Sequence, residues 1–294
     1  MATFAHIRFI VNPIAGTRRG DIQSMIRSVM AGVSFDICET EAAGHGESLA
    51  REAARAGVDL VVAVGGDGTL NEVGRGLLGT ECALGVVPLG SGNALARAMG
   101  IPMGPEAACR VFLHPRVQTI DAGRMGESVF LANAGVGLDA EVVWRYNNRS
   151  GGRRGLWPYV VLTLSTLQTY RPEPIRVVLA EGTSFSCSPL LLAVANTDQY
   201  GNGATIAPGA VPDDGRLDLC VMDSPGVGRL VFHGWRLFTG TIDRMPGVRL
   251  FRTQGLRIER ETSGRFQVDG EAKEGGAVLE VEVLPGAIRL VVPE

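Results

Sequence analysis

The chain has 294 residues, of which 45% are hydrophobic and 20% are charged. At about 150 residues per domain this length suggests two domains, and the composition excludes a disordered or fibrous protein. The formal net charge of −3 gives no general attraction to nucleic acid, so we expect no nucleic-acid partner. The five cysteines are too widely spaced to indicate a zinc site or a disulfide framework.

The first 125 residues alternate short apolar runs with segments of helical periodicity. We expect strands at residues 7–11, 34–38, 60–64 and 83–87, and helices at 21–31, 47–56, about 70–78 and up to 99. Continuous apolar strands that alternate with helices are typical of a parallel sheet covered on both faces. The sequence therefore predicts a doubly wound α/β domain over residues 1–125.

The pattern changes after about residue 125, where turn signals separate many short strands. We expect strands at residues 129–132, 175–179, 190–195, 217–222, 256–259, 266–268, 278–283 and 288–292, and helices near 159–169 and 228–239. This predicts a β-sandwich domain over residues 126–284. Whether residues 285–294 return to the first domain is left open by the sequence.

The strongest local motif is Gly65-Gly66-Asp67-Gly68-Thr69, which directly follows the predicted strand at 60–64. Glycines let the backbone approach a ligand closely, and the N–H groups at a helix start bind anions, so the motif indicates a phosphate site. Asp67 could hold a magnesium ion between phosphates, or it could serve only as a helix cap. We expect Thr69 to cap the helix with its hydroxyl. The only lysine is Lys273, which excludes a Walker A lysine in this motif.

Two further corners and one further residue, Thr40, follow strands of the same predicted sheet. The segment from Asn12 to Gly16 follows the first strand, Thr40 follows the second, and Gly90-Ser91-Gly92-Asn93 follows the strand at 83–87. Ligands of such sheets collect at the carboxyl ends of the strands, near the switch in strand order. We therefore expect these corners to border one crevice.

Together with Val268-Asp269-Gly270-Glu271, these motifs resemble the diacylglycerol kinase catalytic-domain family, which includes bacterial lipid kinases and the sphingosine and ceramide kinases. The resemblance spans nearly the whole chain. It implies the α/β plus β-sandwich fold of the NAD-kinase and diacylglycerol-kinase type. It also implies an ATP- and Mg-dependent kinase that phosphorylates a lipid hydroxyl, with diacylglycerol or a related neutral lipid as the first candidate.

The resemblance also implies roles for individual residues. It makes Glu271 the proton acceptor and, with Asp67, a catalytic residue, and it places Asp139 where sphingosine kinases have a head-group carboxylate. It implies a second magnesium site at the Asp214 carboxylate and the backbone carbonyls of Val211 and Arg216. The residues that it places around the nucleotide are Asn12, Pro13, Ile14, Ala15, Gly16, Thr40, Gly66, Asp67, Gly68, Thr69, Leu70, Asn71, Glu72 and Ser91.

Simpler interpretations of the same residues stay open. By spacing alone, Asp269-Gly270-Glu271 is a hairpin turn, Asp213-Asp214-Gly215 is an ordinary turn, and Asp139 could cap a helix. Basic residues precede Trp157, and residues 230–238 include Trp235 and Phe238. Both stretches suit either a bilayer surface or a buried helix. The basic residues are Arg145, Arg149, Arg153 and Arg154.

Other functions also remain as alternatives. The Ser91-Gly92-Asn93-Ala94 segment is closer to sphingosine kinases, so a sphingoid-base kinase is the second candidate. An NAD kinase shares the Gly-Gly-Asp-Gly-Thr corner, and a non-catalytic nucleotide- or lipid-binding regulator is the third alternative. The expected partners are a lipid alcohol and, transiently, a membrane surface, with a homodimer left open. Because no signal peptide and no run of about 18 apolar residues is visible, we expect a cytoplasmic protein, and a peripheral location at the inner membrane face stays open.

Overall fold

The structure is a computed structural model, which describes residues 4–16, 22–149, 156–224 and 226–294. The chain divides into two compact units, residues 1–120 with 286–294 and residues 121–285. Asp21, at the start of the first expected helix, and Arg153 and Arg154 of the basic stretch lie outside the described residues.

The first unit is built on parallel strands with the order β2-β1-β3-β4, which confirms the predicted α/β architecture. Its strands are β1 (Ile7–Val11), β2 (Phe35–Glu39), β3 (Leu60–Gly65) and β4 (Ala83–Pro88). Its helices are α1 (Ile22–Val29), α2 (His45–Arg55), α3 (Asp67–Leu77), α4 (Ala94–Ala98) and α5 (Pro105–Arg110), followed by the 3-10 turn η1 (Val111–Leu113). Every residue of β3 and β4 is buried, as expected for strands covered on both faces.

The direction in which the chain adds strands to the sheet reverses after β2. From β1 the chain proceeds outward to β2, then returns to place β3 and β4 on the other side of β1. All four strands are parallel, so their carboxyl ends share one edge of the sheet. This reversal creates the topological switch point at which ligands of such sheets bind.

The end of the chain forms one long strand, β18 (Val278–Val292), rather than the two expected at 278–283 and 288–292. The strand includes a Pro-Gly pair, where Gly286 adopts a positive φ of 60° that a glycine tolerates without strain. The residues after this point belong to the first unit, where Leu290 pairs with Leu84 of β4.

The second unit is a sandwich of antiparallel sheets, as predicted. One sheet has the order β14-β13-β10-β7-β16-β17, and the facing sheet contains β18, β15, β8 and β9, with β5 and β6 beside them. Apolar side chains from both sheets, such as Leu192 and Val281, form one buried cluster. The strands are β5 (Arg116–Met125), β6 (Ser128–Phe130), β7 (Asn133–Gly137), β8 (Ile175–Leu179), β9 (Ser184–Cys187), β10 (Pro189–Ala195), β11 (Gln199–Gly201), β12 (Ala204–Thr205), β13 (Leu217–Asp223), β14 (Val248–Thr253), β15 (Gly255–Arg260), β16 (Gly264–Val268) and β17 (Glu271–Gly275).

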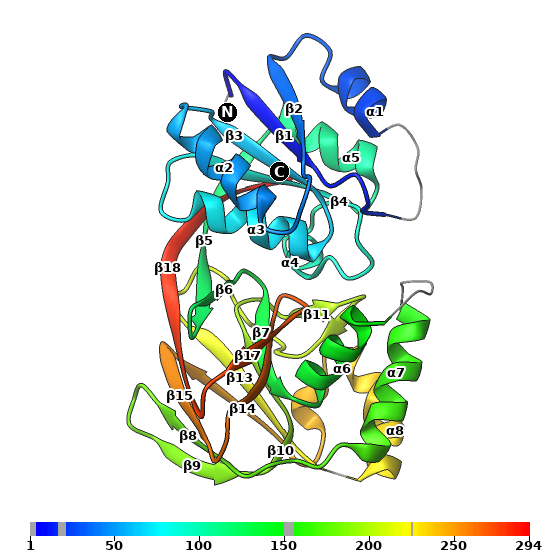
Figure 1. Cartoon of the computed structure of the whole chain (residues 1–294), viewed down its shortest axis with the longest axis vertical. Helices are drawn as coiled ribbons and strands as arrows, with labels where there is room; N and C mark the ends of the chain where they lie inside the picture. The colour runs from blue at the N-terminus through cyan, green and yellow to red at the C-terminus, as the bar shows by residue number, and fades with distance from the viewer. Residues whose placement is uncertain (1–3, 17–21, 150–155, 225) are drawn as a thin grey trace. The chain divides into compact units, whose positions relative to one another are not determined.

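Helices cover the outer face of the six-stranded sheet. Alternate residues of β10 face opposite sides, so Leu192 joins the sandwich core while Leu190 packs against the helices. The helices are α6 (Leu138–Asn147), α7 (Leu156–Thr169) and α8 (Val227–His233), and Figure 1 shows them gathered on one side of this unit. The helix expected over 228–239 is shorter: α8 ends at His233, and the 3-10 turns η2 (Gly234–Leu237) and η3 (Ile242–Arg244) follow.

Candidate active site

The loops after the four parallel strands lie side by side. Backbone hydrogen bonds join them: Asn12 N–H donates to Val64, at 3.0 Å, Thr40 N–H donates to Val11, at 2.9 Å, and Leu89 N–H donates to Gly65, at 2.7 Å. The corners that carry most of the expected nucleotide-binding residues therefore meet at one edge of the sheet.

The glycines at this edge allow two backbones to touch. A Cβ atom on Gly90 would lie 2.7 Å from the Cα of Gly66, so neither loop has room for a side chain at that contact. By contrast, a Cβ atom on Gly68 would meet nothing within 4 Å, so the backbone there faces open space. A closely packed base with an open rim is a suitable shape for phosphate oxygens.

Helix α3 begins at Asp67, three residues earlier than expected. Its first helical hydrogen bond runs from Leu70 N–H to the carbonyl of Gly66, at 3.0 Å. The N–H groups of Gly68 and Thr69 precede that bond and have no acceptor within the helix. Helix starts of this kind bind anions through free N–H groups and the helix dipole. The residues present therefore fit the phosphates of a nucleotide.

Asp67 connects this helix start to the next loop. Its Oδ2 accepts the N–H of Asn93 and its Oδ1 accepts the N–H of Ala94, both at 2.8 Å, so the carboxylate caps the start of α4. Burial raises the pKa of the Asp67 carboxyl, while the two N–H groups act in the opposite direction. Each carboxylate oxygen has more than one lone-pair position, so accepting one N–H leaves capacity for a cation. An anchored carboxylate of this kind fits the hard oxygen ligands that magnesium prefers.

Thr69 does not cap α3, contrary to the expectation from sequence. The residue at the cap position is Gly66, because the helix starts earlier than predicted. The Oγ1 of Thr69 instead accepts a hydrogen bond from Nδ2 of Asn12, at 3.0 Å. Asn12 also accepts the N–H of Ile14 through Oδ1, at 3.1 Å, so it ties the loop after β1 to α3.

Other residues expected around the nucleotide differ in how much of them a ligand could reach. Leu70 and Asn71 are buried, each 5% exposed, so neither side chain is open to a ligand. Ile14 is 87% exposed, and Pro13 and Ser91 are also exposed. Within the loop after β1, Ala15 is partly buried and Gly16 takes a positive φ of 88°.

Glu72 faces α2 rather than the open rim of the loops. Its two carboxylate oxygens accept the N–H groups of Gly44, at 2.8 Å, and Gly46, at 3.0 Å. These N–H groups lie at the start of α2, so the negative charge also complements the helix dipole. Glu72 thereby fixes the segment that follows β2, which begins with Thr40.

In the second unit, Glu271 follows a two-residue hairpin turn. Asp269 and Gly270 have φ values of 45° and 79°, and Val268 pairs with Glu271 across the turn. The hairpin interpretation is therefore correct, and it is compatible with a catalytic role because the turn presents Glu271 at the start of β17. Glu271 is partly exposed, and its Oε2 pairs with the Nζ of Lys273 at 2.7 Å.

Asp269 anchors this turn. No separate role for its side chain is expected from sequence, but its carboxylate is buried and accepts three backbone N–H groups at 2.7–3.0 Å. The donors are Leu131, Ala132 and Asn133. An Asp-Gly pair between strands signals a hairpin, but the partners lie more than 130 residues away and could not be identified from sequence.

Asp139 lies in the first turn of α6 and is 7% exposed. Its Oδ2 accepts hydrogen bonds from the hydroxyl of Tyr200 and from Nε2 of Gln267, the latter at 3.2 Å. Burial raises the pKa of the Asp139 carboxyl to about 6, against the lowering effect of these donors and of the Ala140 N–H. The cap position of α6 is Gly137 and no side chain caps this helix, so the expectation that Asp139 caps it is wrong, because the helix begins at Leu138 and Asp139 lies within it. The head-group role stays a prediction.

The expected second magnesium site contains an arginine. The Asp214 carboxylate pairs with Arg252 and accepts the N–H of Arg216 at 3.0 Å. A cation bound there would have to displace the Arg252 guanidinium, so the observed arrangement does not itself present a free carboxylate. In the described parts of the chain, no group of three or more acidic, histidine or cysteine side chains could hold a metal ion.

Asp121 was missed by the sequence interpretation and holds the same loop. Its Oδ2 accepts the N–H of Gly215 at 2.7 Å, and its own N–H donates to the carbonyl of Pro212 at 2.6 Å. Asp121 is 3% exposed within an otherwise apolar stretch of β5. An acidic residue inside a buried strand is the signal that could have revealed it.

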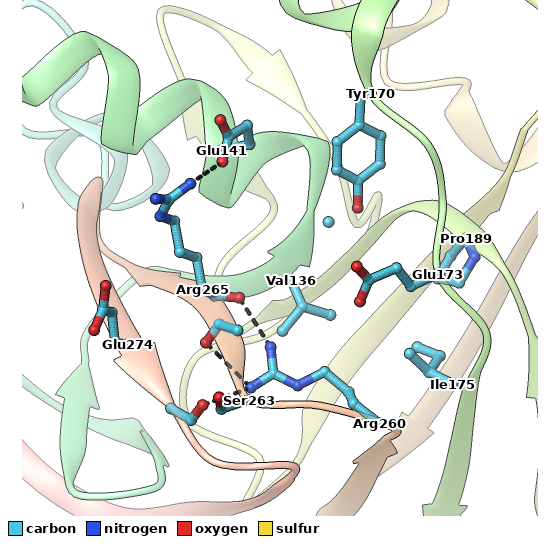
Figure 2. A pocket seen from close by; sticks show the side chains of 13 residues that line it. Val136, Glu141, Tyr170, Glu173, Ile175, Pro189, Arg260, Ser263, Arg265 and Glu274 are labelled. Carbon is cyan, nitrogen blue, oxygen red and sulfur yellow. Dashed lines mark hydrogen bonds and ion pairs between the residues drawn. The ribbon is translucent and has the colours of Figure 1, made fainter.

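A cavity of about 440 Å³ lies in the second unit (Figure 2). Its wall includes Tyr170, Glu173 and Arg260. The guanidinium of Arg260 donates to backbone carbonyls, including that of Arg265 at 3.0 Å, so this arginine supports the wall. None of the residues predicted for catalysis, nucleotide, substrate or metal lines this cavity.

Comparison with known proteins identifies the family. Residues 6–125 match the diacylglycerol kinase catalytic domain, and residues 132–292 match the YegS C-terminal NAD kinase beta sandwich-like domain. The chain belongs to the diacylglycerol kinase and YegS family of lipid kinases. It is therefore a lipid kinase, and a kinase of this family uses ATP.

Relatives and a solved structure cover nearly all of this lipid kinase. A Pseudomonas putida protein named "Probable lipid kinase YegS-like" is 31% identical over 280 residues, which cover 93% of this chain and 90% of that protein. A Bacillus subtilis protein named "Diacylglycerol kinase" is 27% identical, with 95% and 91% coverage. A solved structure from Bacillus anthracis has a TM-score of 0.82 at 25% identity, with 99% and 96% coverage.

Proposed function

We propose that this lipid kinase transfers the γ-phosphoryl group of ATP to the hydroxyl of diacylglycerol or a related neutral lipid. The observation that carries the proposal is the start of α3, where free N–H groups of Gly68 and Thr69 stand beside the anchored Asp67 carboxylate. The name of the Bacillus subtilis relative supports diacylglycerol as the acceptor. A sphingoid base is the second candidate acceptor.

The nucleotide-binding role falls to the first unit. The N–H groups of Gly68 and Thr69 bind phosphate oxygens, and Asp67 holds magnesium, which neutralises phosphate charge when it is bound. The only lysine, Lys273, belongs to the other unit, so backbone amides and arginines must supply the rest of the positive charge around the phosphates.

Glu271 is proposed as the general base. The lipid O–H bond breaks as its proton passes to the Glu271 carboxylate, and the oxygen forms a bond to the γ-phosphorus. The bond between that phosphorus and the β–γ bridging oxygen breaks, and ADP leaves with the electron pair. Positioned carboxylates serve as proton acceptors for alcohols in phosphoryl transfer.

A transfer assay tests this function. Purified protein receives labelled ATP and magnesium with micelles of diacylglycerol, micelles of sphingosine, or NAD. We expect label in diacylglycerol; label only in sphingosine or NAD would contradict the proposed acceptor.

A substitution tests the general base separately. Glu271→Gln should lower kcat by about 10²–10⁴-fold while ATP binding persists, because the amide cannot accept the proton. Glu274→Gln, an exposed change on the same strand, is the matched control and should keep its turnover. Unchanged turnover of the Glu271 variant would remove Glu271 from the mechanism.

We also propose that α7 and the α8–η2 segment contact the membrane that supplies the lipid. Along α7, Trp157, Val161 and Leu164 are exposed at a spacing that places them on one face. Phe232, Trp235 and Phe238 are also exposed, and no acidic residue occurs between 156 and 169 or between 226 and 241. Exposed apolar groups without acidic neighbours suit an anionic bilayer.

Within the described residues, every helix is too short or too polar to cross a bilayer. We propose that the protein works from the cytoplasm, at the inner membrane face.

A further inference from the structure

A buried glutamine links Asp139 to the turn before Glu271. Gln267 lies on β16 and is 2% exposed. Its Oε1 accepts the N–H of Gly270 at 3.0 Å, and its Nε2 donates to Oδ1 of Asn133 at 3.1 Å and to Oδ2 of Asp139 at 3.2 Å. Both ends of this side-chain amide are therefore engaged.

The partners of Gln267 determine which way its amide points. An ionised carboxylate can only accept hydrogen bonds, so the NH₂ end of Gln267 must face Asp139. The carbonyl end then faces Gly270, whose N–H can only donate. If the amide were rotated by 180°, Oε1 of Gln267 would face Oδ2 of Asp139, and its NH₂ group would face the N–H of Gly270. Neither pair can form a hydrogen bond, so this orientation would leave buried polar groups unpaired at a cost in free energy. Asp139 thus fixes the orientation of the Gln267 amide, and the oxygen of that amide holds the N–H of Gly270 in the turn.

The Gly270 residue is held on both sides of its Cα atom. Gln267 accepts its N–H, and Nδ2 of Asn147 donates to its carbonyl oxygen at 3.1 Å. Gly270 adopts a φ of 79°, so few other conformations of the turn preserve these bonds. The carbonyl of Gly270 belongs to the peptide group that leads directly into Glu271. A rotation of this peptide group would redirect the Glu271 side chain.

Helix α6, which carries both Asp139 and Asn147, is itself fixed to the hairpin. The Glu141 carboxylate on α6 pairs with Arg265 of β16, as Figure 2 shows. Arg265 also lies over the ring of Trp144 on α6, with its guanidinium carbon 3.8 Å from the ring centroid. The helix and the hairpin therefore form one braced assembly within the second unit.

We propose that Gln267 is a positioning residue, which fixes the orientation of the turn and of Glu271 through the N–H of Gly270, with its own amide oriented by Asp139. This inference rests on the proposed role of Glu271 as the proton acceptor. Gln267 does not touch the reacting atoms in this account; it acts on the reaction only through the backbone of the turn.

The first test replaces the amide with an apolar side chain of similar size. Gln267→Leu should lower kcat by about 10- to 100-fold, because small displacements of a reacting group have effects of this size. The KM for ATP should stay within about twofold, since the proposed ATP-binding residues belong to the other unit. Gln254→Leu, an exposed glutamine of the second unit, is the matched control and should change neither constant.

Hydrogen exchange at Gly270 measures the bond directly. The Gly270 amide should lose protection in Gln267→Leu, while amides in the centres of β10 and β13 keep theirs. The proposal is overturned if Gln267→Leu keeps its kcat, or if its kcat falls while the Gly270 amide stays protected.

A paired exchange of donor and acceptor addresses the risk that Gln267→Leu simply misfolds. Gln267→Glu still accepts the Gly270 N–H but places a second carboxylate beside Asp139, so kcat should fall. Adding Asp139→Asn supplies an NH₂ group that can donate to the carboxylate introduced by Gln267→Glu, so protection of the Gly270 amide should return to that of the parent. A double variant whose Gly270 amide is as unprotected as in the single Gln267→Glu variant would contradict the proposal.

The two proposals fail in different ways. If Glu271→Gln keeps full turnover, the proton-acceptor role is wrong, and Gly270 exchange still reports whether Gln267 holds the turn. If Glu271→Gln is inactive and Gln267→Leu is fully active, the acceptor role stands and the positioning role alone is wrong.

Discussion

Asp67 and Asn93 join two glycine-rich loops through one hydrogen bond, in which Oδ2 of Asp67 accepts the backbone N–H of Asn93 at 2.8 Å. Asn93 adopts a positive φ of 51°, a conformation that asparagine tolerates better than most residues. The carboxylate proposed to hold magnesium is therefore also the group that fixes the neighbouring loop. A substitution at Asp67 should affect both binding and local stability.

Asp67→Asn tests both the magnesium-binding role and the stabilising role of this carboxylate. The Asn amide can accept only one of the two N–H groups, so we expect a loss of about 1–3 kcal/mol in unfolding free energy together with at least about 100-fold lower kcat. Urea denaturation and the transfer assay measure the two effects. Asp59→Ala is the control, because Oδ2 of Asp59 accepts the N–H groups of both Ala5 and His6 in the same unit and alanine removes this acceptor. The control should lose stability and keep its activity; full activity in Asp67→Asn would contradict the proposed role.

The buried Asp139 carboxyl should make stability depend on pH. Burial raises its pKa from 3.8 to about 6, so the folded protein binds this proton more tightly than the unfolded chain does. Its stabilising contribution is therefore fully present below about pH 4 and is lost as the pH rises through about 6. The difference in unfolding free energy between the parent and Asp139→Asn should change by up to about 3 kcal/mol over this window.

Urea denaturation of both proteins between about pH 4 and pH 7 measures that difference. The two proteins are compared because burial also raises the pKa of Asp218 to about 6. Asp218 therefore adds the same pH-dependent change in unfolding free energy to both proteins, and this change cancels in their difference. A difference that is constant across this range would show that Asp139 does not titrate there.

Magnesium should reveal whether Asp214 binds a cation. If Asp214 with the carbonyls of Val211 and Arg216 takes magnesium, adding the ion should raise the Tm of the parent and leave that of Asp214→Asn unchanged. Arg252→Met removes the guanidinium that pairs with Asp214, so this variant should respond at lower magnesium concentration. Differential scanning calorimetry measures the shifts. An equal response in Asp214→Asn would place the responsible ion elsewhere.

Membrane contact should depend on the exposed aromatic side chains of α7 and α8. Trp157 and Phe232 are 75% and 73% exposed, and burying either ring in a bilayer contributes about 1–3 kcal/mol. We expect Trp157→Ser or Phe232→Ser to weaken binding to anionic vesicles by about tenfold, as measured by sedimentation. Val278→Ser, an exposed apolar change on β18, is the control. Binding that is unchanged in both aromatic variants would exclude this surface.

Short-range features of the fold could be predicted from the sequence. The apolar runs of β3 and β4 are long enough and uniform enough to identify buried parallel strands, and Asp269-Gly270 between two strands identified a hairpin. Other local predictions failed. The two expected strands at 278–283 and 288–292 are one strand, β18, and the early start of α3 displaced Thr69 from the cap position.

The sequence by itself determined the alternation of strands and helices and the placement of glycine-rich corners after strands, because periodicity and turn chemistry depend on residues close together in the chain. Only the tertiary structure decided the partners of the acidic side chains. Asp67 reaches Asn93, Glu72 reaches Gly44, and Asp269 reaches Leu131 across 26, 28 and 138 positions. Such hydrogen bonds exist only after packing has brought distant segments together, so no local pattern encodes them.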